Sequence, residues 1–350
     1  MCSAMKGSAA HSSPRAQLRD IAIALPDQVV TNDDLLATIS PDKRALMVRH
    51  TGVLKRHVAK TEETALDLGE EACRKLFTKY PDLPARVDAL IFCTQSADYL
   101  LPSNACVLHG RLGLPDTVAA FDLPHACSAY IYAISLVQAL IASGAKNHVL
   151  VVTADTYSKY IHPQDRSTRL LFGDGAAVTW FAPGDSSGGI MDVVCGTDGR
   201  HFDKFWVPAG GCREPLNDAL RRHETRDSSG NVRSRADIHM AGRDMFSFVS
   251  SRIPAHVRGV LARNDLTVES IDRFVFHQAS GVILDSLTQL LDLDPTRVIR
   301  HLDDIGNTVS ASIPLALRAA LDDGRICANQ RVLLCGFGAG LSWGSALLTW

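Results

Sequence analysis

The sequence predicts a layered α/β fold made of two similar halves. Continuous apolar runs bounded by turn residues, which are typical of buried strands, alternate with helical patterns along the chain. The segment 87–96 (VDALIFCTQS) matches 271–280 (IDRFVFHQAS) at an offset of 184, and 122–144 matches 303–324 at an offset near 180. One duplicated α/β unit explains both the alternation and the internal repeat.

Each half is expected to contain the same order of elements, a buried strand, then a helix, then a second buried strand. The strands are predicted from their continuous apolar runs, and the helices from their length and from apolar residues on a helical period. The expected elements, in chain order, are 87–96, Ala129–Ser143, 148–155 (HVLVVTAD), 271–280, Ile313–Leu321 and 331–338 (RVLLCGFG).

The segment between the halves, 182–189 (APGDSSGG), is rich in glycine and serine and is the expected junction. We therefore expect an N-terminal half at 17–182 and a C-terminal half at 189–350. The first residues, 1–16, are small and polar, with no apolar stretch behind their charges. They predict a loose N-terminal tail and not a secretory signal.

Composition and charge argue against several classes of partner. Hydrophobic residues make up 46% of the 350 residues and charged residues 21%, as in ordinary globular proteins. The net charge of −2 favours neither nucleic acid nor an anionic membrane, and no apolar run reaches the roughly 18–20 residues of a membrane span. The nine cysteines show no metal-ligand spacing, and they predict a reduced cytoplasmic protein without a metal or other cofactor.

Cys127 is the strongest candidate for a reactive residue. It directly precedes the segment 128–143 (SAYIYAISLVQALIAS), which is apolar nearly all round and is predicted to form a buried helix. A thiol at such a helix start meets the positive end of the helix dipole and unpaired backbone N–H groups, which predicts a lowered pKa. The alternative is a small apolar residue that fills the core, and the polar companions described next favour the nucleophile.

Two polar residues of the C-terminal half are the expected companions of the thiol. His277 ends the strand FVFHQAS, and Asn307 follows Gly306, which permits a tight turn in DIGNTVS. At the offset near 180, Asn307 corresponds to Cys127, so a pseudo-twofold arrangement would bring both helix starts together. A lone histidine is more often structural, but histidine and asparagine together supply donors that stabilise a developing enolate or oxyanion.

The glycine-rich segment 336–344 (GFGAGLSWG) lacks the lysine of a nucleotide-binding loop. Two interpretations stay open, a loop whose backbone N–H groups pass close to the reacting carbonyl, and a tight turn between strands. Packing is the simpler role for Cys93, Cys195 and Cys335 in strand-like runs and for Cys106 on a probable helix. Cys2, Cys73, Cys212 and Cys327 have no supporting context.

From about Ala22 to Trp350 the chain resembles β-ketoacyl-acyl-carrier-protein synthase III and its relatives in the thiolase-like superfamily. The resemblance implies a five-layered αβαβα fold, a homodimer and a catalytic triad of Cys127, His277 and Asn307. It also implies an oxyanion hole formed by the backbone N–H groups of Cys127 and Ala339. The motifs that carry the resemblance are TGVLKRHVA (51–59), DYLLPSNACVLHGRLGL (98–114), DRSTRLLFGDGAA (165–177), MAGRDMF (240–246), FVFHQAS (274–280), DIGNTVSASIP (304–314) and GFGAGLSWGSALL (336–348).

The residues expected to bind the thioester substrate depart in part from this family. Leu46 holds the position of a tryptophan that stacks on the adenine of coenzyme A, and His50 stands where an arginine is usual. Arg243 replaces an asparagine, whereas Arg166 retains an arginine that contacts the pantetheine or nucleotide end. These four residues are the predicted substrate-binding positions.

The segment after HQA also differs, because the family often has Asn-x-Arg there, followed by basic residues that dock an acyl carrier protein. This chain reads Ser280, Gly281 and Val282. The resemblance therefore implies a specialised pathway member more than the initiator of fatty-acid synthesis. Acyl thioesters and an acyl carrier protein are the partners it implies.

Four functions remain open from the sequence. The favoured one is transfer of an acyl group from a thioester to Cys127, followed by decarboxylative condensation with a malonyl thioester. The second is acyl transfer to a hydroxyl or amine without decarboxylation, which the intact Asn307 disfavours. The third is a papain-like cysteine hydrolase, for which the Cys127–His277 spacing is suitable but the local cysteine motif is absent. The fourth is a non-catalytic scaffold.

Overall fold

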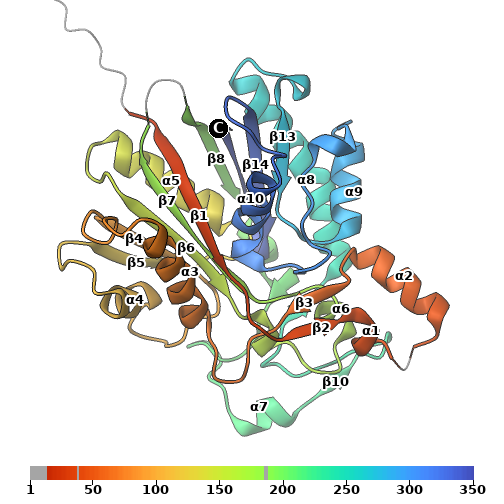
Figure 1. Cartoon of the computed structure of the whole chain (residues 1–350). Coiled ribbons are helices and arrows are strands. Elements are labelled where there is room, and N and C mark those ends of the chain that lie inside the picture. Colours follow the sequence, from red (N-terminus) through yellow and green to blue (C-terminus); the bar gives the residue numbers. More distant parts are fainter. Residues whose placement is uncertain (1–13, 38, 185–187) are drawn as a thin grey trace, which may run out of the picture.

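Two sheets enclose a pair of central helices in the computed structural model, which describes residues 14–37, 39–184 and 188–350 (Figure 1). The first sheet has the order β1-β7-β6-β4-β5, in which β4, β5 and β6 run parallel and β7 pairs antiparallel with β1 and β6. Its strands are β1 (Ala16–Ala24), β4 (Ala89–Cys93), β5 (Ala119–Leu123), β6 (Val149–Asp155) and β7 (Gly175–Pro183).

The second sheet has the order β13-β14-β15-β8. Strands β13 and β14 are parallel, whereas β15 pairs antiparallel with β14 and β8. Every residue of β4 and β6 is buried, and only the first residue of β14 is exposed, as expected for apolar strands covered on both faces. The strands of this sheet are β8 (Gly189–Thr197), β13 (Arg273–Phe276), β14 (Arg331–Gly338) and β15 (Ser342–Thr349).

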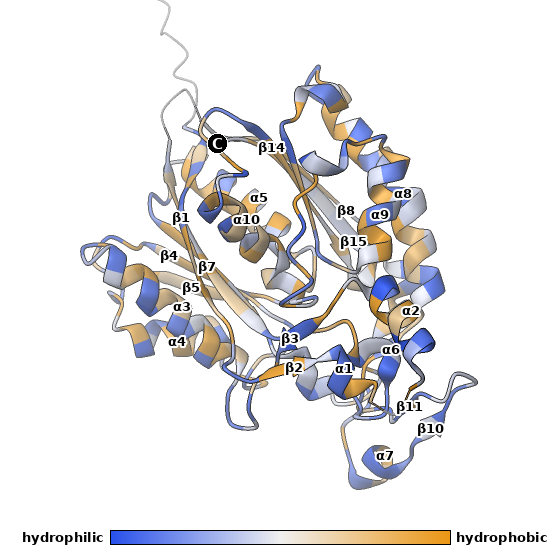
Figure 2. Cartoon of the chain, turned by 45° about the vertical axis from the view of Figure 1, so that its right-hand side comes forward, coloured by the Kyte–Doolittle hydropathy of each residue, from blue (hydrophilic) through white to orange (hydrophobic). Residues whose placement is uncertain are grey.

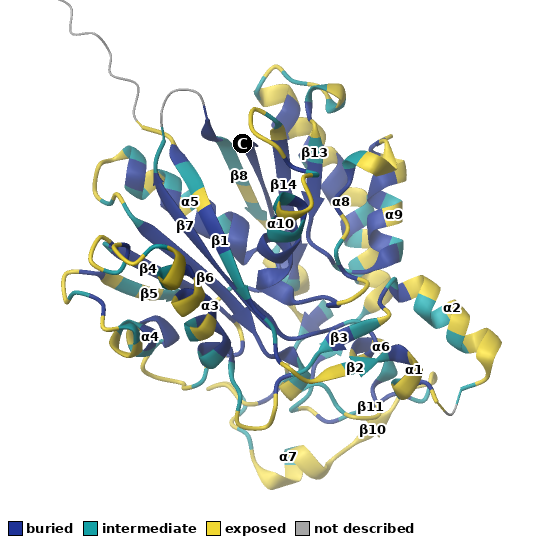
Figure 3. Cartoon of the chain, viewed as in Figure 1, coloured by how far each residue is buried: buried dark blue, intermediate teal, exposed yellow. Residues whose placement is uncertain are grey.

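Helices α5 and α10 fill the space between the sheets, α3 and α4 cover the outer face of the first sheet, and α8 and α9 cover the second. The predicted five-layered thiolase-like αβαβα fold is thus confirmed. Figure 3 shows the central helices buried, and Figure 2 shows both hydrophilic and hydrophobic residues on α8 and α9. The layer helices are α3 (Ala65–Lys79), α4 (Asn104–Leu112), α5 (Ala129–Ala142), α8 (Gly242–Arg263), α9 (Gly281–Leu290) and α10 (Ser312–Asp322).

Short elements gather at one end of the layers, in the lower right of Figure 1. None of the helices in the described ranges is long and apolar enough to cross a membrane. The short helices are α1 (Asn32–Leu35), α2 (Pro41–Thr51), α6 (Arg166–Arg169) and α7 (Asp218–Arg222). The short strands are β2 (Val29–Thr31), β3 (Lys55–His57), β9 (Phe205–Trp206), β10 (Thr225–Arg226), β11 (Val232–Arg233) and β12 (His239–Met240). The 3₁₀ turns are η1 (Tyr157–Tyr160), η2 (Gly199–Lys204), η3 (Val268–Ser270), η4 (Pro295–Arg297), η5 (Val309–Ala311) and η6 (Ala339–Leu341).

All six predicted elements exist within a few residues of their expected ends. The predicted tail is wrong at its last residue, because Ala16 is fully buried and pairs with Pro183 as the first residue of β1. Residues 1–13 of that tail and 185–187 of the predicted junction lie outside the described residues. The order β1-β7-β6-β4 in one sheet parallels β8-β15-β14-β13 in the other. This correspondence supports the duplication, which we retain as a proposal.

Candidate active site

A cavity of about 1020 Å³ is lined by several of the short elements and extends inward to Cys127. Its walls come from α2, α6, the start of α8, the start of α9 and the loop that follows β13. Seven residues that the sequence singled out line this one cavity, although they lie far apart along the chain. They are Leu46, His50, Cys127, Arg166, Arg243, His277 and Asn307.

Cys127 lies two residues before α5 at the inner end of this cavity, and only 2% of it is exposed. Burial raises the pKa of its thiol above the ordinary value, and the negative charge of Asp155 acts in the same direction. The predicted lowering of this pKa is therefore wrong, because removal of the thiolate from water outweighs the favourable backbone contribution. The sulfur is held as a neutral thiol that must lose its proton during the reaction.

His277 directly follows β13, and its backbone N–H donates to the carbonyl oxygen of Cys335 on β14 (2.8 Å). Its ring nitrogen Nδ1 lies 2.6 Å from Oγ of Ser312, the first residue of α10. Burial lowers the pKa of the imidazole to about 3, so the ring is neutral at physiological pH. Ser312 fixes the plane of the ring and leaves Nε2 free for a ligand.

Asn307 is held by its own backbone and by its neighbours. Its N–H donates to Leu171 O (2.8 Å), and its side-chain Oδ1 accepts from the N–H of Val309 (3.0 Å). Val309 has a φ of +55°, a conformation that costs a β-branched residue about 1–3 kcal/mol. The bond from Val309 occupies Oδ1 and so fixes the orientation of the amide group, whose Nδ2 is the donor.

The turn before Asn307 is as predicted, since Gly306 has a φ of +68° and a Cβ there would lie 2.8 Å from Leu171 O. The expectation that Asn307 itself begins a helix is wrong. The short turn η5 intervenes, and α10 begins at Ser312. Ser310 in this turn donates through Oγ to the buried carboxylate of Asp155 (2.6 Å), which ties the turn to β6.

The glycine-rich segment forms the hairpin between β14 and β15, so the tight-turn interpretation describes its local structure. Gly338 also lines the cavity beside the thiol. Ala339 does not line the cavity but packs against the apolar cluster that contains Cys127. Ser342 Oγ donates to Ala339 O (2.9 Å) and lies 2.7 Å from Ser128 Oγ. These two hydroxyl groups connect the start of α5 to the turn.

We predict that Gly338→Ala will slow acylation of Cys127 by at least about 10-fold. A Cβ at this position would lie 2.8 Å from Cβ and 3.0 Å from Sγ of Cys127, so the thiol must move. The φ of 168° is extended backbone, so the substitution adds no backbone strain. Gly259→Ala, on the exposed side of α8, is the matched control, because no heavy atom lies within 4 Å of its Cβ position and its φ is outside the left-handed region. Acyl-enzyme formation timed by mass spectrometry measures both, and equal rates for Gly338→Ala and the parent would contradict the prediction.

An aromatic wall closes the cavity next to the thiol. Phe172 and Phe205 line it, and Tyr157 packs behind them, with ring centroids 5.5–6.4 Å apart. All three belong to the buried cluster around Cys127. An acyl group on this sulfur therefore meets an apolar surface.

The remaining predicted residues lie at the mouth of the cavity. Leu46 and His50 project from α2, and Leu46 is 67% exposed. Arg243 stands on the first turn of α8, and Arg166 on α6. The mouth is thus basic on two sides and has no aromatic face at position 46.

The other cysteines differ in their surroundings. Cys93 and Cys335 are buried in β4 and β14 as predicted. The core role predicted for Cys106 is wrong, because this residue lies on the exposed side of α4 and its Sγ accepts a hydrogen bond from Ser103. Cys195 is on β8 but exposed. Among the cysteines in the described ranges, Cys127 alone lines the cavity.

Residues 121–199 match the family 3-oxoacyl-[acyl-carrier-protein] synthase III, and residues 261–350 match its C-terminal region. The β-ketoacyl-[acyl-carrier-protein] synthase III of Methylococcus capsulatus is 37% identical over 93% of this chain and 95% of that protein. The chain belongs to the 3-oxoacyl-[acyl-carrier-protein] synthase III family. Members of this family are acyltransferases, so the papain-like hydrolase is excluded and the predicted family is confirmed.

Solved structures of the family superpose closely on this chain. A 3-oxoacyl-(acyl-carrier-protein) synthase III structure is 41% identical with a TM-score of 0.92, covering 96% of this chain and all of the other. The priming β-ketosynthase of the R1128 polyketide pathway is 29% identical with a TM-score of 0.83, covering 98% and 99% of the two chains. Both share the arrangement of layers described above.

Proposed function

We propose that this chain is a β-ketoacyl synthase III-like enzyme in which Cys127 takes an acyl group from a thioester and passes it to a malonyl thioester. The observation that carries the proposal is that the thiol of Cys127, the imidazole of His277 and the amide of Asn307 line one cavity. All three residues are buried. The donor is an acyl thioester of coenzyme A or of an acyl carrier protein. No metal or further cofactor is needed, because thioester exchange and decarboxylation both proceed with these three groups.

In the first step the sulfur of Cys127 attacks the thioester carbonyl, and a carbon–sulfur bond forms. The proposed oxyanion hole is the pair of backbone N–H groups of Cys127 and Ala339, and the N–H of Ala339 directly follows Gly338, which lines the cavity. Collapse of the oxyanion breaks the donor's carbon–sulfur bond. The departing thiolate of the donor takes the proton of the Cys127 thiol. The donor thus becomes a free thiol, and Cys127 carries the new thioester. The Ser128–Ser342 hydroxyl pair positions the turn that carries Ala339.

In the second step the malonyl thioester loses its carboxylate as carbon dioxide, and the electron pair enters an enolate. Two donors, Nε2 of His277 and Nδ2 of Asn307, hold the enolate oxygen. Ser312 Oγ accepts a hydrogen bond from the backbone N–H of Gln278 (3.4 Å), so its own proton is available to Nδ1 of His277. Nδ1 is then the acceptor, and the ring proton of His277 lies on Nε2. The enolate carbon then attacks the acyl group, a carbon–carbon bond forms, and the thiolate of Cys127 leaves and is reprotonated.

The direct test is to incubate the parent protein with an acyl thioester and a labelled malonyl thioester. We expect an acyl mass shift on the Cys127 peptide, released carbon dioxide and a 3-oxoacyl thioester. Transfer of the acyl group to an alcohol or amine without carbon dioxide release would replace condensation by the second function considered from the sequence. Absence of any acyl-enzyme would favour the scaffold.

The neutral state of His277 has a consequence for pH. Its folded-state pKa of about 3 lies below the ordinary 6.5, so the unfolded chain takes up the proton first. We predict that this residue contributes stability that is fully present above about pH 6.5 and is lost as pH falls towards 3. The ring carbon signals of His277 in NMR should therefore stay at their neutral positions from pH 8 to 5. An inflection within that range would contradict the prediction, and His277→Gln should flatten the acid limb of the stability curve.

We propose that the protein is a homodimer joined along the edge of its first sheet. Strand β5 lies at that edge, and Phe121 on it is 37% exposed. The neighbouring segment before α4 exposes 97% of Leu100 and 83% of Leu101. An unpaired strand edge beside exposed apolar side chains is typical of a covered interface.

We predict a dimer mass by light scattering at micromolar concentration, and a monomer mass for Leu101→Glu with Phe121→Glu. Leu290→Glu is the matched control, since Leu290 is exposed on α9 away from this edge and its variant should remain a dimer. A monomeric parent would refute the interface.

We further propose a cytoplasmic location, which is supported by the free state of the eight cysteines in the described ranges.

A further inference from the structure

Asp155, the last residue of β6, carries a fully buried carboxylate that accepts hydrogen bonds from three separate segments. Its Oδ1 accepts from Thr94 Oγ1 (3.2 Å), the N–H of Gln95 (2.9 Å) and Ser96 Oγ (3.3 Å), which directly follow β4. Its Oδ2 accepts from the N–H (3.2 Å) and from Oγ (2.6 Å) of Ser310 on η5. This one side chain therefore connects the ends of two parallel strands to the turn before α10.

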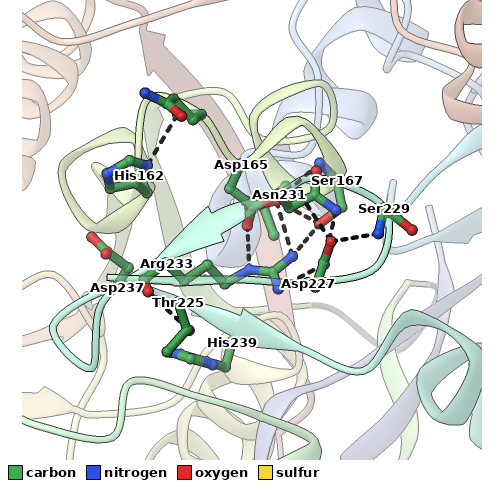
Figure 4. Close-up of polar contacts among 12 residues, drawn as sticks. His162, Asp165, Ser167, Thr225, Asp227, Ser229, Asn231, Arg233, Asp237 and His239 are labelled. Atoms are coloured by element: carbon green, nitrogen blue, oxygen red, sulfur yellow. Dashed lines mark hydrogen bonds and ion pairs between the residues drawn. The ribbon is translucent and has the colours of Figure 1, made fainter. Parts of the chain in front are cut away.

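None of the groups that donate to Asp155 is a cation, although other buried carboxylates of the chain are paired with one. Asp165 accepts from Nε (2.7 Å) and Nη2 (3.0 Å) of Arg233 (Figure 4). Asp20 likewise lies 2.5 Å from Nζ of Lys79. Burial raises the pKa of Asp155 to about 6, so the carboxylate is ionised at pH 8. Removal of such an ion from water is costly, and the hydrogen bonds to it offset part of this cost.

The turn that Asp155 contacts is strained at Val309, whose φ is +55°. A β-branched residue avoids this region, so the turn keeps its shape only while its neighbours hold it. On one side the N–H of Val309 donates to Oδ1 of Asn307 (3.0 Å). On the other side Ser310 donates twice to Asp155. Because hydrogen bonds to an ionised group are roughly twice as strong as neutral ones, this carboxylate is well placed to offset the strain.

The same turn determines where the amide of Asn307 points. Its Oδ1 is used by Val309, and its Nδ2 lies 3.4 Å from the carbonyl oxygen of Ala279, which lines the cavity two residues after His277. A turn that relaxed around Val309 would move Nδ2 relative to the imidazole. Two donors must meet at one enolate oxygen, and a misplacement of about 1 Å costs about 100-fold in rate.

We propose that Asp155 is a positioning residue for the second step, which holds η5 so that Nδ2 of Asn307 meets the enolate oxygen. The inference rests on the proposed function, because the enolate forms only when a malonyl thioester loses carbon dioxide. Asp155 is not among the residues that line the cavity, so it acts through Ser310 and Val309. Acylation should not need it, because its negative charge raises the pKa of the Cys127 thiol and so opposes loss of the proton.

The test compares two variants that weaken this contact from its two sides. Asp155→Asn keeps the size of the side chain and removes its charge, whereas Ser310→Ala removes the hydroxyl donor and keeps the carboxylate. The matched control is Asp20→Asn, which neutralises a buried carboxylate on β1 that does not line the cavity. If circular dichroism shows that Asp155→Asn does not fold, Ser310→Ala decides the outcome.

Three quantities are measured at pH 8. They are the rate of acyl-enzyme formation, kcat and KM for carbon dioxide release from a malonyl thioester by the preformed acyl-enzyme, and hydrogen–deuterium exchange of the peptide that contains Val309 and Ser310. We expect kcat to fall about 10- to 100-fold in Asp155→Asn, with acylation and KM within about 3-fold of the parent. The fall in Ser310→Ala should be smaller, because the N–H of Ser310 still binds the carboxylate. Exchange of the turn should be faster in both variants, and Asp20→Asn should match the parent in all three quantities.

Exchange that stays as in the parent in both variants would overturn the proposal, and so would an equal fall in acylation and carbon dioxide release. The same changes in Asp20→Asn would show a general loss of stability and would also overturn it. A parent that releases no carbon dioxide would refute the proposed function. The exchange measurement needs no turnover, so it would still decide whether Asp155 holds the turn.

Discussion

Replacing Cys127 by alanine is expected to abolish acyl-enzyme formation and to lower transfer by more than about 1000-fold. The reason is positional, because among the described cysteines this thiol alone lines the cavity. Cys127→Ser should lose nearly as much, since a hydroxyl in the same buried place is a much weaker nucleophile without an adjacent base. Intact-mass spectrometry after incubation with acyl thioesters measures the loss.

The control for this experiment is Cys106→Ala, because Cys106 is an exposed thiol outside the cavity. This variant should acquire the acyl group as the parent does. Iodoacetamide is a less suitable probe, since burial raises the pKa of the Cys127 thiol while several exposed cysteines compete for the reagent. Retention of the acyl group by Cys127→Ala, or acylation of Cys106 in the parent, would refute the assignment.

The layers of the fold could be predicted because their strands are buried on both faces and therefore appear as continuous apolar runs. The match between 122–144 and 303–324 also related Cys127 to Asn307 at corresponding positions of the two halves. Both residues, with His277, line one cavity although 180 positions separate Cys127 from Asn307. This much of the site follows from local patterns and an internal repeat.

Other parts of the site depend on contacts between distant segments and leave no local signal. Ser312 reaches Nδ1 of His277 from another helix, and Ser342 reaches Ser128 across 214 positions. The lowered pKa expected of Cys127 was wrong because the helix start indicated only the favourable backbone contribution, and the cost of removing the thiolate from water outweighs it. The position of Gly338 in a glycine-rich pattern was the one signal available for its close approach to the thiol.

His277→Ala and Asn307→Ala are expected to acquire an acyl group on Cys127 but to release little carbon dioxide from a malonyl thioester. Decarboxylation leaves an enolate whose charge needs donors that are in place before the reaction. Loss of one such donor costs about 100- to 1000-fold in rate, or roughly 3–4 kcal/mol. Acylation depends mainly on the sulfur and on the backbone N–H groups, so it should fall much less.

Asn307→Asp is the sharper variant, because it keeps the size of the side chain and the acceptor that binds the N–H of Val309. It replaces the Nδ2 donor by an oxygen that repels the enolate, so its carbon dioxide release should be at least as low as that of Asn307→Ala. If the loss instead came from collapse of the turn around Val309, Asn307→Asp would retain activity that Asn307→Ala lacks. Acyl-enzyme mass and labelled carbon dioxide, measured together for the parent and all three variants, separate these outcomes. Variants that lose acylation and decarboxylation in equal proportion would show that His277 and Asn307 act on the first step and not on the enolate.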